Sequence, residues 1–492
     1  MLPSSGKGRV AWLTLAAAAI VVACRVWLAM AVPLTDTTEA RYGEMARKMV
    51  ETGTWLLAQH DYGVPYMGKP PLAFWLSAVG IELLGPGQLG PRLLILLSGV
   101  GFLLYLHRWL KREIGPGAAA AGVLVLMSSV LYFVSMAAVM TDLVLVATVD
   151  IALLAFWRRV NGGGKGDEWL FFIMIGLGLL TKGPLAGFLV AAPIVIWALL
   201  CGRVGETWQR VAWFKGALVT GLVAVPWYIA AEWQYPGFLR YFIIGENFDR
   251  FLVSNWQGDL YGSPHEYPHG TIWLFLLIGA LPWSLIGIAA FVRSRRALKQ
   301  NYRQHRELAV YMLIAAGIPM LLFTAAQNII FPYALPALVP GVIAALVFLG
   351  ETGMSSRLIT GTVVAAVATA LAFVAGAAML RDQIELESDR ALVMAIEQQY
   401  SAPPDSIYYW QLRVFSADYY SGGRATVLDN VEDIENMLAE RKPFYLVMKN
   451  SQFDALPKGL QASLRKLGEY SRKAIYGPAE PVAIEARSAD GR

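Results

Sequence analysis

The chain has 492 residues, of which 56% are hydrophobic and 16% are charged, with a formal net charge of +5 at pH 7. This composition is too apolar for a water-soluble protein of several domains, so most of the chain is predicted to lie in lipid. We assign the positive charge to basic residues kept on the cytoplasmic side of a membrane, and we expect no nucleic-acid partner.

Apolar segments of membrane-spanning length recur through the first three quarters of the chain. A hydrocarbon core of about 30 Å requires roughly 20 mostly apolar residues per helix. The segments are continuously apolar and do not alternate with polar residues, which favours helices over the strands of a barrel. We predict about eleven spans, and at most thirteen, at 11–32, 92–110, 117–139, 141–158, 169–181, 184–200, 211–231, 271–292, 308–324, 331–350 and 358–380.

Lysine and arginine accumulate in the loops that stay in the cytoplasm. With the N-terminus inside, basic groups such as Arg158-Arg159 and the run 293–306 fall on the cytoplasmic side. An odd number of spans then places the loops 33–91 and 232–270, and the segment 381–492, on the outer side of the membrane. We therefore expect the active site there.

The sequence divides into a predicted transmembrane domain, residues 1–380, and a C-terminal extracytoplasmic domain, residues 381–492. In the second domain, apolar runs predict strands at 406–410 and 444–448, and helical spacing predicts helices at 431–440 and 459–467. Alternation of strands and helices favours a soluble α/β fold.

The first outer loop contains two predicted helices and an acidic motif. Residues 38–52 have the spacing of an amphipathic helix on the membrane face, and residues 71–85 favour a short interfacial or re-entrant helix. Asp36 and Glu39 precede Arg41, so a carboxylate could accept the proton of an attacking hydroxyl while the arginine binds a phosphate. The same residues could instead cap the helix and favour its dipole.

Other charged residues fall at the predicted outer ends of the spans. Lys69 lies in the motif Gly68-Lys69-Pro70-Pro71 and could bind a phosphate or extend to the membrane surface. Asp142 and Lys182 lie at span ends that are predicted to share one side, so they could line one cavity. Asp150, deeper in its span, is expected to serve packing or a buried hydrogen bond.

The loop 232–270 supplies Glu246, Arg250 and His265. His265 and its neighbour Glu266 raise the question of a metal site, but their spacing matches no recognised ligand pattern, so no metal or other cofactor is predicted. The chain also has no phosphate-binding or dinucleotide-binding glycine motif. A nucleotide-sugar donor would be on the cytoplasmic side, whereas a sugar carried on a lipid fits the predicted topology.

Together these motifs resemble the GT-C glycosyltransferases of the protein mannosyltransferase and aminoarabinose transferase group, glycosyltransferase family 39. The resemblance covers most of the membrane domain. It rests on the segments 39–47, 68–71, 141–142, 181–184, 226–227, 246–251, 265–268, 281–283 and 333–336.

The resemblance implies an inverting transfer of a sugar from a polyprenyl phosphate, such as undecaprenyl phosphate, to an outer-face acceptor such as lipid A or an envelope glycan. It implies three groups of site residues. The catalytic candidates are Asp36, Glu39 and Asp142, with the choice between Asp36 and Glu39 open; the donor phosphate candidates are Arg41, Lys69, Lys182, Arg250 and Tyr333; and other cavity candidates are Tyr42, Tyr66, Glu246 and His265.

Two alternatives stay open. A protein O-mannosyltransferase-like enzyme would use a serine or threonine acceptor, and the sequence does not separate it from a lipid or glycan transferase. A lipid or solute transporter would also be polytopic, but it predicts ionisable groups near the middle of the membrane and paired broken helices. Neither the sugar nor the acceptor is identified by the sequence.

Overall fold

The computed structural model describes residues 6–250, 258, 260–261, 267–293, 305–326, 328–350, 354–399, 406–441, 443–470 and 472–479. The chain divides into two units. The first consists of Met1–Met30 and Met49–Gly376, and the second of Ala31–Lys48 and Ala377–Arg492.

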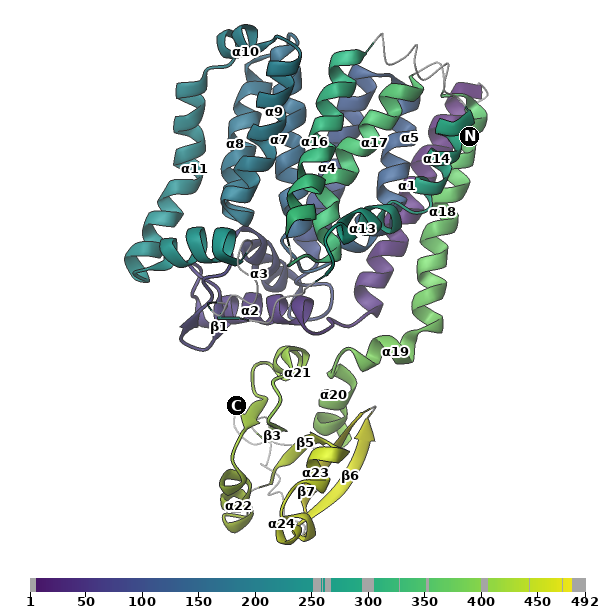
Figure 1. Cartoon of the computed structure of the whole chain (residues 1–492). Helices are drawn as coiled ribbons and strands as arrows, with labels where there is room; N and C mark the ends of the chain where they lie inside the picture. The colour runs from purple at the N-terminus through teal and green to yellow at the C-terminus, as the bar shows by residue number, and fades with distance from the viewer. Residues whose placement is uncertain are drawn as a thin grey trace, which may run out of the picture. The chain divides into compact units, whose positions relative to one another are not determined.

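The first unit is a bundle of helices, of which α4, α7, α8, α9, α16 and α17 run alongside one another in Figure 1. Apolar segments in lipid are expected to be helical, because a helix satisfies its backbone hydrogen bonds within one segment. Apart from the helices of the loop 33–91, the helices of this unit are α1 (Gly6–Ala31), α4 (Leu93–Glu113), α5 (Pro116–Ser128), α6 (Val130–Ser135), α7 (Asp142–Val160), α8 (Lys165–Lys182), α9 (Pro184–Leu200), α10 (Val204–Arg210), α11 (Trp213–Gln234), η1 (Arg240–Asp249), α13 (Thr271–Gly279), α14 (Trp283–Arg293), α16 (Arg306–Ala325), η2 (Phe331–Ala334), α17 (Leu335–Leu349) and α18 (Ser356–Met379).

The predicted helical, polytopic class is confirmed, whereas the number of about eleven spans is not. Within the described residues, six helices are long and apolar enough to cross a membrane, and the bent pair α13 and α14 would make a seventh. The apolar helices α5 and α9 are shorter than this length. Each predicted span nevertheless coincides with one helix or with two helices separated by a short break.

Two of these breaks are joined to each other. Helices α13 and α14 bend by 94° around a segment that contains Pro282, which has no backbone N–H to continue a helix. Ser129 separates α5 from α6 in an extended conformation. The N–H of Val130 donates to the carbonyl of Leu281 at 3.1 Å, and the indole of Trp283 donates to the hydroxyl of Ser128 at 3.0 Å. The backbone groups released by one break thus bond to the other.

The loop 33–91 forms helices where the sequence predicted them. Helix α2 spans Thr38–Thr52, and helix α3 spans Leu72–Leu84. Between them lies a small hairpin of β1 (Gln59–Asp61) and β2 (Val64–Pro65). The indole N–H of Trp227 on α11 donates to the carbonyl of Leu56 at 2.7 Å, which fixes the segment around Leu56 against α11.

The second unit contains a five-stranded sheet with the order β4-β3-β5-β7-β6. Strand β3 pairs in parallel with β4 and β5, whereas β7 pairs antiparallel with β5 and β6. Apolar side chains on the two faces form separate buried clusters. The elements are α19 (Arg381–Leu386), α20 (Arg390–Gln399), β3 (Ile407–Trp410), α21 (Phe415–Tyr420), β4 (Thr426–Leu428), α22 (Val431–Ala439), β5 (Tyr445–Lys449), α23 (Asn450–Asp454), α24 (Lys458–Ala462), β6 (Leu464–Tyr470) and β7 (Lys473–Pro478).

The strands predicted at 406–410 and 444–448 and the helix predicted at 431–440 correspond to β3, β5 and α22. The helix predicted at 459–467 is wrong in its second half, because α24 ends at Ala462 and β6 begins at Leu464. Backbone pairing with β7, from Leu464 opposite Pro478 to Tyr470 opposite Lys473, overrides the weak local helical pattern.

Candidate functional site

A cavity of about 460 Å³ lies in the first unit. It receives residues from the first outer loop, the junction of α8 and α9, helix η1 and the segment between α16 and α17. Its lining is Lys69, Lys182, Pro184, Leu185, Phe188, Phe242, Glu246, Asn247, Phe248, Arg250, Leu322, Phe323, Asn328 and Tyr333.

Lys69 is positioned by the compact turn that precedes it. A Cβ atom on Gly68 would come within 2.9 Å of the Tyr66 ring, so a larger residue at this position would displace that ring. The hydroxyl of Tyr261 accepts the N–H of Met67 at 3.0 Å and donates to the carbonyl of Pro65 at 2.9 Å. These contacts hold the chain so that the Lys69 ammonium reaches the cavity.

Lys182 is the last residue of α8, and its position depends on the break before α9. Gly183 has φ = +60°, a left-handed conformation that glycine adopts without strain, and Pro184 starts the next helix. The Lys182 ammonium donates to Asp142 at 2.7 Å and lies 4.7 Å from the centre of the Tyr333 ring. The side chains of Lys182 and Asp142 are each only 7% exposed, so each charge depends on the other.

Glu246 on η1 connects the remaining cations. Its Oε2 accepts from Lys69 at 2.9 Å and from Arg250 at 3.0 Å, and its Oε1 accepts from the Tyr241 hydroxyl at 3.2 Å. Burial alone would raise the pKa of Glu246, but Lys69 and Arg250 outweigh it and lower the pKa below its ordinary value. Glu246 is therefore an anion that holds two cations at one edge of the cavity.

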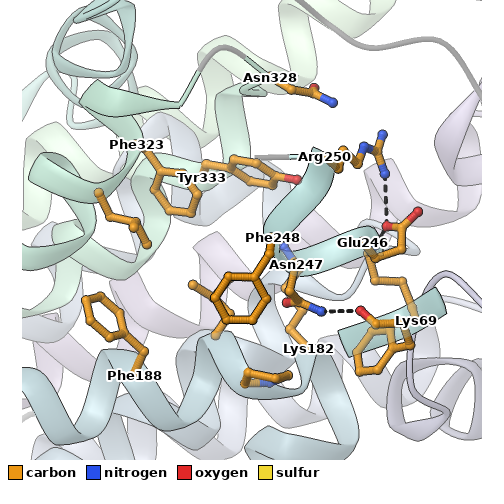
Figure 2. Close-up of a pocket in the computed structure, with 14 residues that line it drawn as sticks. Lys69, Lys182, Phe188, Glu246, Asn247, Phe248, Arg250, Phe323, Asn328 and Tyr333 are labelled. Atoms are coloured by element: carbon orange, nitrogen blue, oxygen red, sulfur yellow. Dashed lines mark hydrogen bonds and ion pairs between the residues drawn. The ribbon is translucent and has the colours of Figure 1, made fainter. Parts of the chain in front are cut away.

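The cavity has an apolar side and a charged side. In the view of Figure 2, Phe188 and Phe323 lie on one side and Lys69, Glu246 and Arg250 on the other. Sequence reasoning missed Phe188, Phe323 and the other apolar lining residues, because a phenylalanine in a span has the same pattern whether it faces lipid, core or cavity. Asn247 was also missed, and its amide donates to the carbonyl of Phe242 at 2.7 Å.

The first-loop candidates belong to the second unit. Asp36 accepts hydrogen bonds from the backbone N–H of Ser416, at 3.0 Å, and from its hydroxyl. Glu39 lies in the first turn of α2 and is half-buried. The Arg41 guanidinium lies 5.5 Å from the ring centre of Tyr42, which is buried. Asp36, Glu39, Arg41 and Tyr42 thus lie close together in the chain and all belong to the second unit.

Two further candidates stand apart. Tyr66 is buried and packs against Phe74, with ring centres 5.8 Å apart, and is not among the residues that line the cavity. His265 lies outside the described residues. Within the part of the chain that the structure describes, no three histidine, cysteine, aspartate or glutamate side chains gather as metal ligands.

The lining favours an amphipathic anion. Three lining residues are cationic (Lys69, Lys182 and Arg250), and one, Glu246, is anionic, which leaves an excess of two positive charges. Lysine and arginine are the usual ligands of phosphate oxygens, and an aromatic wall suits an isoprenoid or acyl chain. The arrangement could bind the phosphate of a lipid while its first apolar units contact Phe188 and Phe323.

Comparisons with known proteins point to one group. The family model described as dolichyl-phosphate-mannose-protein mannosyltransferase matches residues 68–229. The undecaprenyl phosphate-α-4-amino-4-deoxy-L-arabinose arabinosyl transferase of Edwardsiella ictaluri is 28% identical over 66% of this chain and 58% of its own length. The enzyme of the same name from Erwinia tasmaniensis is 29% identical over 62% of this chain and 54% of its own length.

Solved structures show the same fold. The crystal structure of ArnT from Cupriavidus metallidurans bound to undecaprenyl phosphate covers 96% of this chain and 98% of its own, with a TM-score of 0.74 and 18% identity. The oligosaccharyltransferase of Archaeoglobus fulgidus covers 91% of this chain with a TM-score of 0.51 and 14% identity. The match spans just over half the length of the curated relatives. These findings confirm the resemblance that the sequence motifs predicted.

Proposed function

The chain resembles GT-C glycosyltransferases of the protein mannosyltransferase and aminoarabinose transferase group, and from this premise we propose that it transfers a sugar from a polyprenyl phosphate to an acceptor outside the cytoplasm. One observation carries the proposal: the cavity combines the cations Lys69, Lys182 and Arg250 with aromatic walls. A phosphate with an isoprenoid tail needs both features.

In the proposed reaction, an acceptor oxygen attacks the anomeric carbon opposite the phosphate, the bond from that carbon to the phosphate oxygen breaks, and polyprenyl phosphate leaves. The departing phosphate gains negative charge, which the Lys69 and Arg250 cations stabilise. The family resemblance alone assigns the proton of the acceptor hydroxyl to a first-loop carboxylate, Asp36 or Glu39, as general base. We assign Lys182 to the same anion, held in place by Asp142 and Tyr333.

Glu246 acts as a counter-ion in this proposal. Without a ligand it neutralises part of the charge of Lys69 and Arg250, with which it bonds at 2.9 and 3.0 Å. Two cations that share one buried carboxylate can still donate to a phosphate, because lysine and arginine carry several N–H groups each. Glu246 thus fixes both cations in position before the donor binds.

The curated relatives are named for undecaprenyl phosphate and 4-amino-4-deoxy-arabinose, so this donor is the first one to test. Lipid A is the proposed acceptor. The family model is named for a protein mannosyltransferase, which favours a second candidate with polyprenyl-phosphate mannose and a protein acceptor. We place the protein in a bacterial inner membrane with its site on the periplasmic side.

We also propose eleven spans with a C-terminal α/β domain outside the membrane. Helices α5, α7, α8 and α9, added to the seven candidates found by length and composition, give this number. The cavity supports the proposal, because it collects residues from the first loop, the α8–α9 junction, η1 and the α16–α17 segment, which this topology places on one side.

The test is transfer by the purified full-length protein, with the sugar followed by mass spectrometry of the acceptor. We expect lipid A to gain one sugar residue from undecaprenyl-phosphate 4-amino-4-deoxy-arabinose. We also expect Lys69→Met with Arg250→Met to weaken binding of undecaprenyl phosphate by about 10- to 100-fold, since each replaces a charge-assisted hydrogen bond donor. Lys466→Met is the matched control, because Lys466 is an exposed lysine of the second unit.

Other outcomes have defined meanings. Transfer of mannose to a protein, with none to lipid A, would favour the second candidate. Binding of undecaprenyl phosphate without sugar transfer from either donor would contradict the proposed transferase activity and favour a lipid transporter. Unchanged binding in the double variant would contradict the assignment of the cavity to the phosphate.

A further inference from the structure

The segment before α2 and the C-terminal segment are held together by backbone hydrogen bonds. The N–H of Asp36 donates to the carbonyl of Glu387 at 2.8 Å, and the N–H of Leu34 donates to the hydroxyl of Tyr420 at 2.7 Å. Leu34 is completely buried. A stretch of the first outer loop is thus built into a unit whose other residues lie more than 300 positions away.

The Asp36 carboxylate is the centre of this connection. Its Oδ1 accepts the N–H of Ser416 at 3.0 Å, and its Oδ2 accepts the Ser416 hydroxyl. Ser416 is completely buried at the start of α21, and its hydroxyl also accepts the N–H of Asp389 at 2.9 Å. Asp389 in turn pairs with Lys473 on β7 at 2.6 Å. A chain of polar contacts therefore runs from the first loop into the sheet.

Packing around these bonds is tight. The Arg41 guanidinium lies 5.8 Å from the ring centre of Phe415, the neighbour of Ser416. A Cβ atom on Gly43 would approach the Leu34 side chain to 2.5 Å and the Tyr419 ring to 3.4 Å, so a larger residue at this position would displace Leu34. Residues on both sides of Glu39 are thereby fixed against one short helix.

We propose that Asp36 is a positioning residue, which together with Ser416 fixes the first outer loop to the C-terminal α/β segment and so sets the place of Glu39, the acid that carries the chemistry. This proposal rests on the proposed function for the role of Glu39. Each Asp36 oxygen accepts one hydrogen bond from Ser416, so the carboxylate is held in one orientation toward α21, as a positioning contact requires.

The surroundings of Asp36 shift its pKa in opposing directions. Burial is the largest cause and raises the pKa of Asp36 above its ordinary value, against the hydrogen bonds from Ser416, which lower it; the charge of Asp389 also raises this pKa, and that of Lys473 lowers it. Asparagine has the same shape as aspartate: its Oδ1 can still accept the Ser416 N–H, and its Nδ2 replaces Oδ2 and can donate to the Ser416 hydroxyl oxygen. Asp36→Asn therefore keeps at least one hydrogen bond to Ser416, whereas Asp36→Ala removes both.

The experiment compares four variants of the full-length protein, Asp36→Asn, Asp36→Ala, Ser416→Ala and Glu39→Gln, by sugar transfer and by amide hydrogen exchange. We expect Asp36→Asn to keep kcat within about threefold of the wild type, and Glu39→Gln to lower kcat at least about 100-fold. Asp36→Ala and Ser416→Ala should lower kcat about tenfold with an unchanged KM for the donor, since Asp36→Ala removes both hydrogen bonds to Ser416 and Ser416→Ala removes the one from its hydroxyl.

Hydrogen exchange separates positioning from chemistry. Asp36→Ala and Ser416→Ala should raise exchange about tenfold in peptides covering 32–41, 385–391 and 413–421, whereas Glu39→Gln should leave it unchanged. Ser463→Ala is the matched control, because the Ser463 hydroxyl is exposed in the same unit and bonds only to the nearby carbonyl of Gly459 in the described contacts. We expect it to change neither kcat nor exchange in those peptides.

Two results would overturn the proposal. If Asp36→Asn loses as much kcat as Glu39→Gln while exchange stays at the wild-type level, Asp36 is the acid. If neither Asp36→Ala nor Ser416→Ala raises exchange, the bond does not hold the loop. Should the wild type transfer no sugar, the proposed function fails, and exchange alone then decides whether Asp36 fixes the loop to the C-terminal segment.

Discussion

At the residue scale, burial decides what the charged side chains of the first unit contribute. The sequence placed Asp142 and Lys182 at predicted outer span ends and predicted that such residues line one cavity. It did not predict which of them form ion pairs. In the structure they bond at 2.7 Å with both side chains 7% exposed. Such partners cannot be read from a sequence, because 40 positions and a helix junction separate them, and only the packing of α7 on α8 brings them together.

This pair makes a prediction about stability. Asp142→Asn leaves the Lys182 ammonium buried without its counter-charge, so it should lower the free energy of unfolding by about 3–5 kcal/mol. The measurement is chemical unfolding in detergent micelles. The double variant with Lys182→Met should be more stable than either single variant, because it removes both charges.

The matched control is an ion pair of the same length at the surface. Lys466 and Glu469 also lie 2.7 Å apart, but their side chains are 41% and 52% exposed. Glu469→Gln should leave stability unchanged within error, because solvent screens the pair. Equal losses in Asp142→Asn and Glu469→Gln would show that burial of the first pair contributes nothing.

At the element scale, the sequence predicted most helices well, because membrane spans carry long apolar runs and amphipathic spacing marks α2. Less could be predicted where the backbone is interrupted. The division of the predicted span 117–139 into α5 and α6 and the bend between α13 and α14 depend on bonds between two distant breaks. In the second unit, β6 was missed because its residues have a weakly helical local pattern. Pairing with β7, which the local pattern does not show, makes this segment a strand.

The junction of α8 and α9 shows how one element boundary shapes the site. Gly183→Ala would strain a residue at φ = +60° and bring a Cβ atom to 2.5 Å from the Phe242 ring, which lines the cavity. We expect a loss of about 2–4 kcal/mol of stability from strain and overpacking together. Binding of undecaprenyl phosphate should weaken as well, because the Lys182 ammonium and the Phe242 ring are displaced.

Gly202→Ala is the comparison for a glycine with positive φ but no close neighbour. Gly202 has φ = +67°, close to the φ of Gly183, and no atom lies within 4 Å of its Cβ position. It should cost only about 1 kcal/mol and leave lipid binding intact. If both variants lose the same stability and bind lipid equally, the contact with Phe242 has no role in shaping the cavity.

At the scale of the whole molecule, the units do not follow the order of the chain. The sequence divided the protein at residue 380, whereas Ala31–Lys48 belongs to the same compact unit as Ala377–Arg492. Composition cannot reveal this, because Leu34 and Gly43 are ordinary loop and helix residues until α21 is in place. The sequence therefore predicted candidate residues in the acidic loop but not how that loop is held.

Topology gives the last prediction. The eleven-span proposal places residue 183, between α8 and α9, outside the cytoplasm, whereas the seven candidates found by length and composition leave everything between Glu113 and Trp213 on the inner side. Alkaline phosphatase, which is active only outside, can be fused after residues 164, 183 and 380 and assayed in whole cells. We expect an inactive fusion at 164 and active fusions at 183 and 380, because α8 would then cross the membrane and carry Lys182 to the side of Lys69. An inactive fusion at 183 beside an active one at 380 would instead keep α8 and α9 on the inner side, and it would contradict a cavity that takes its donor from outside.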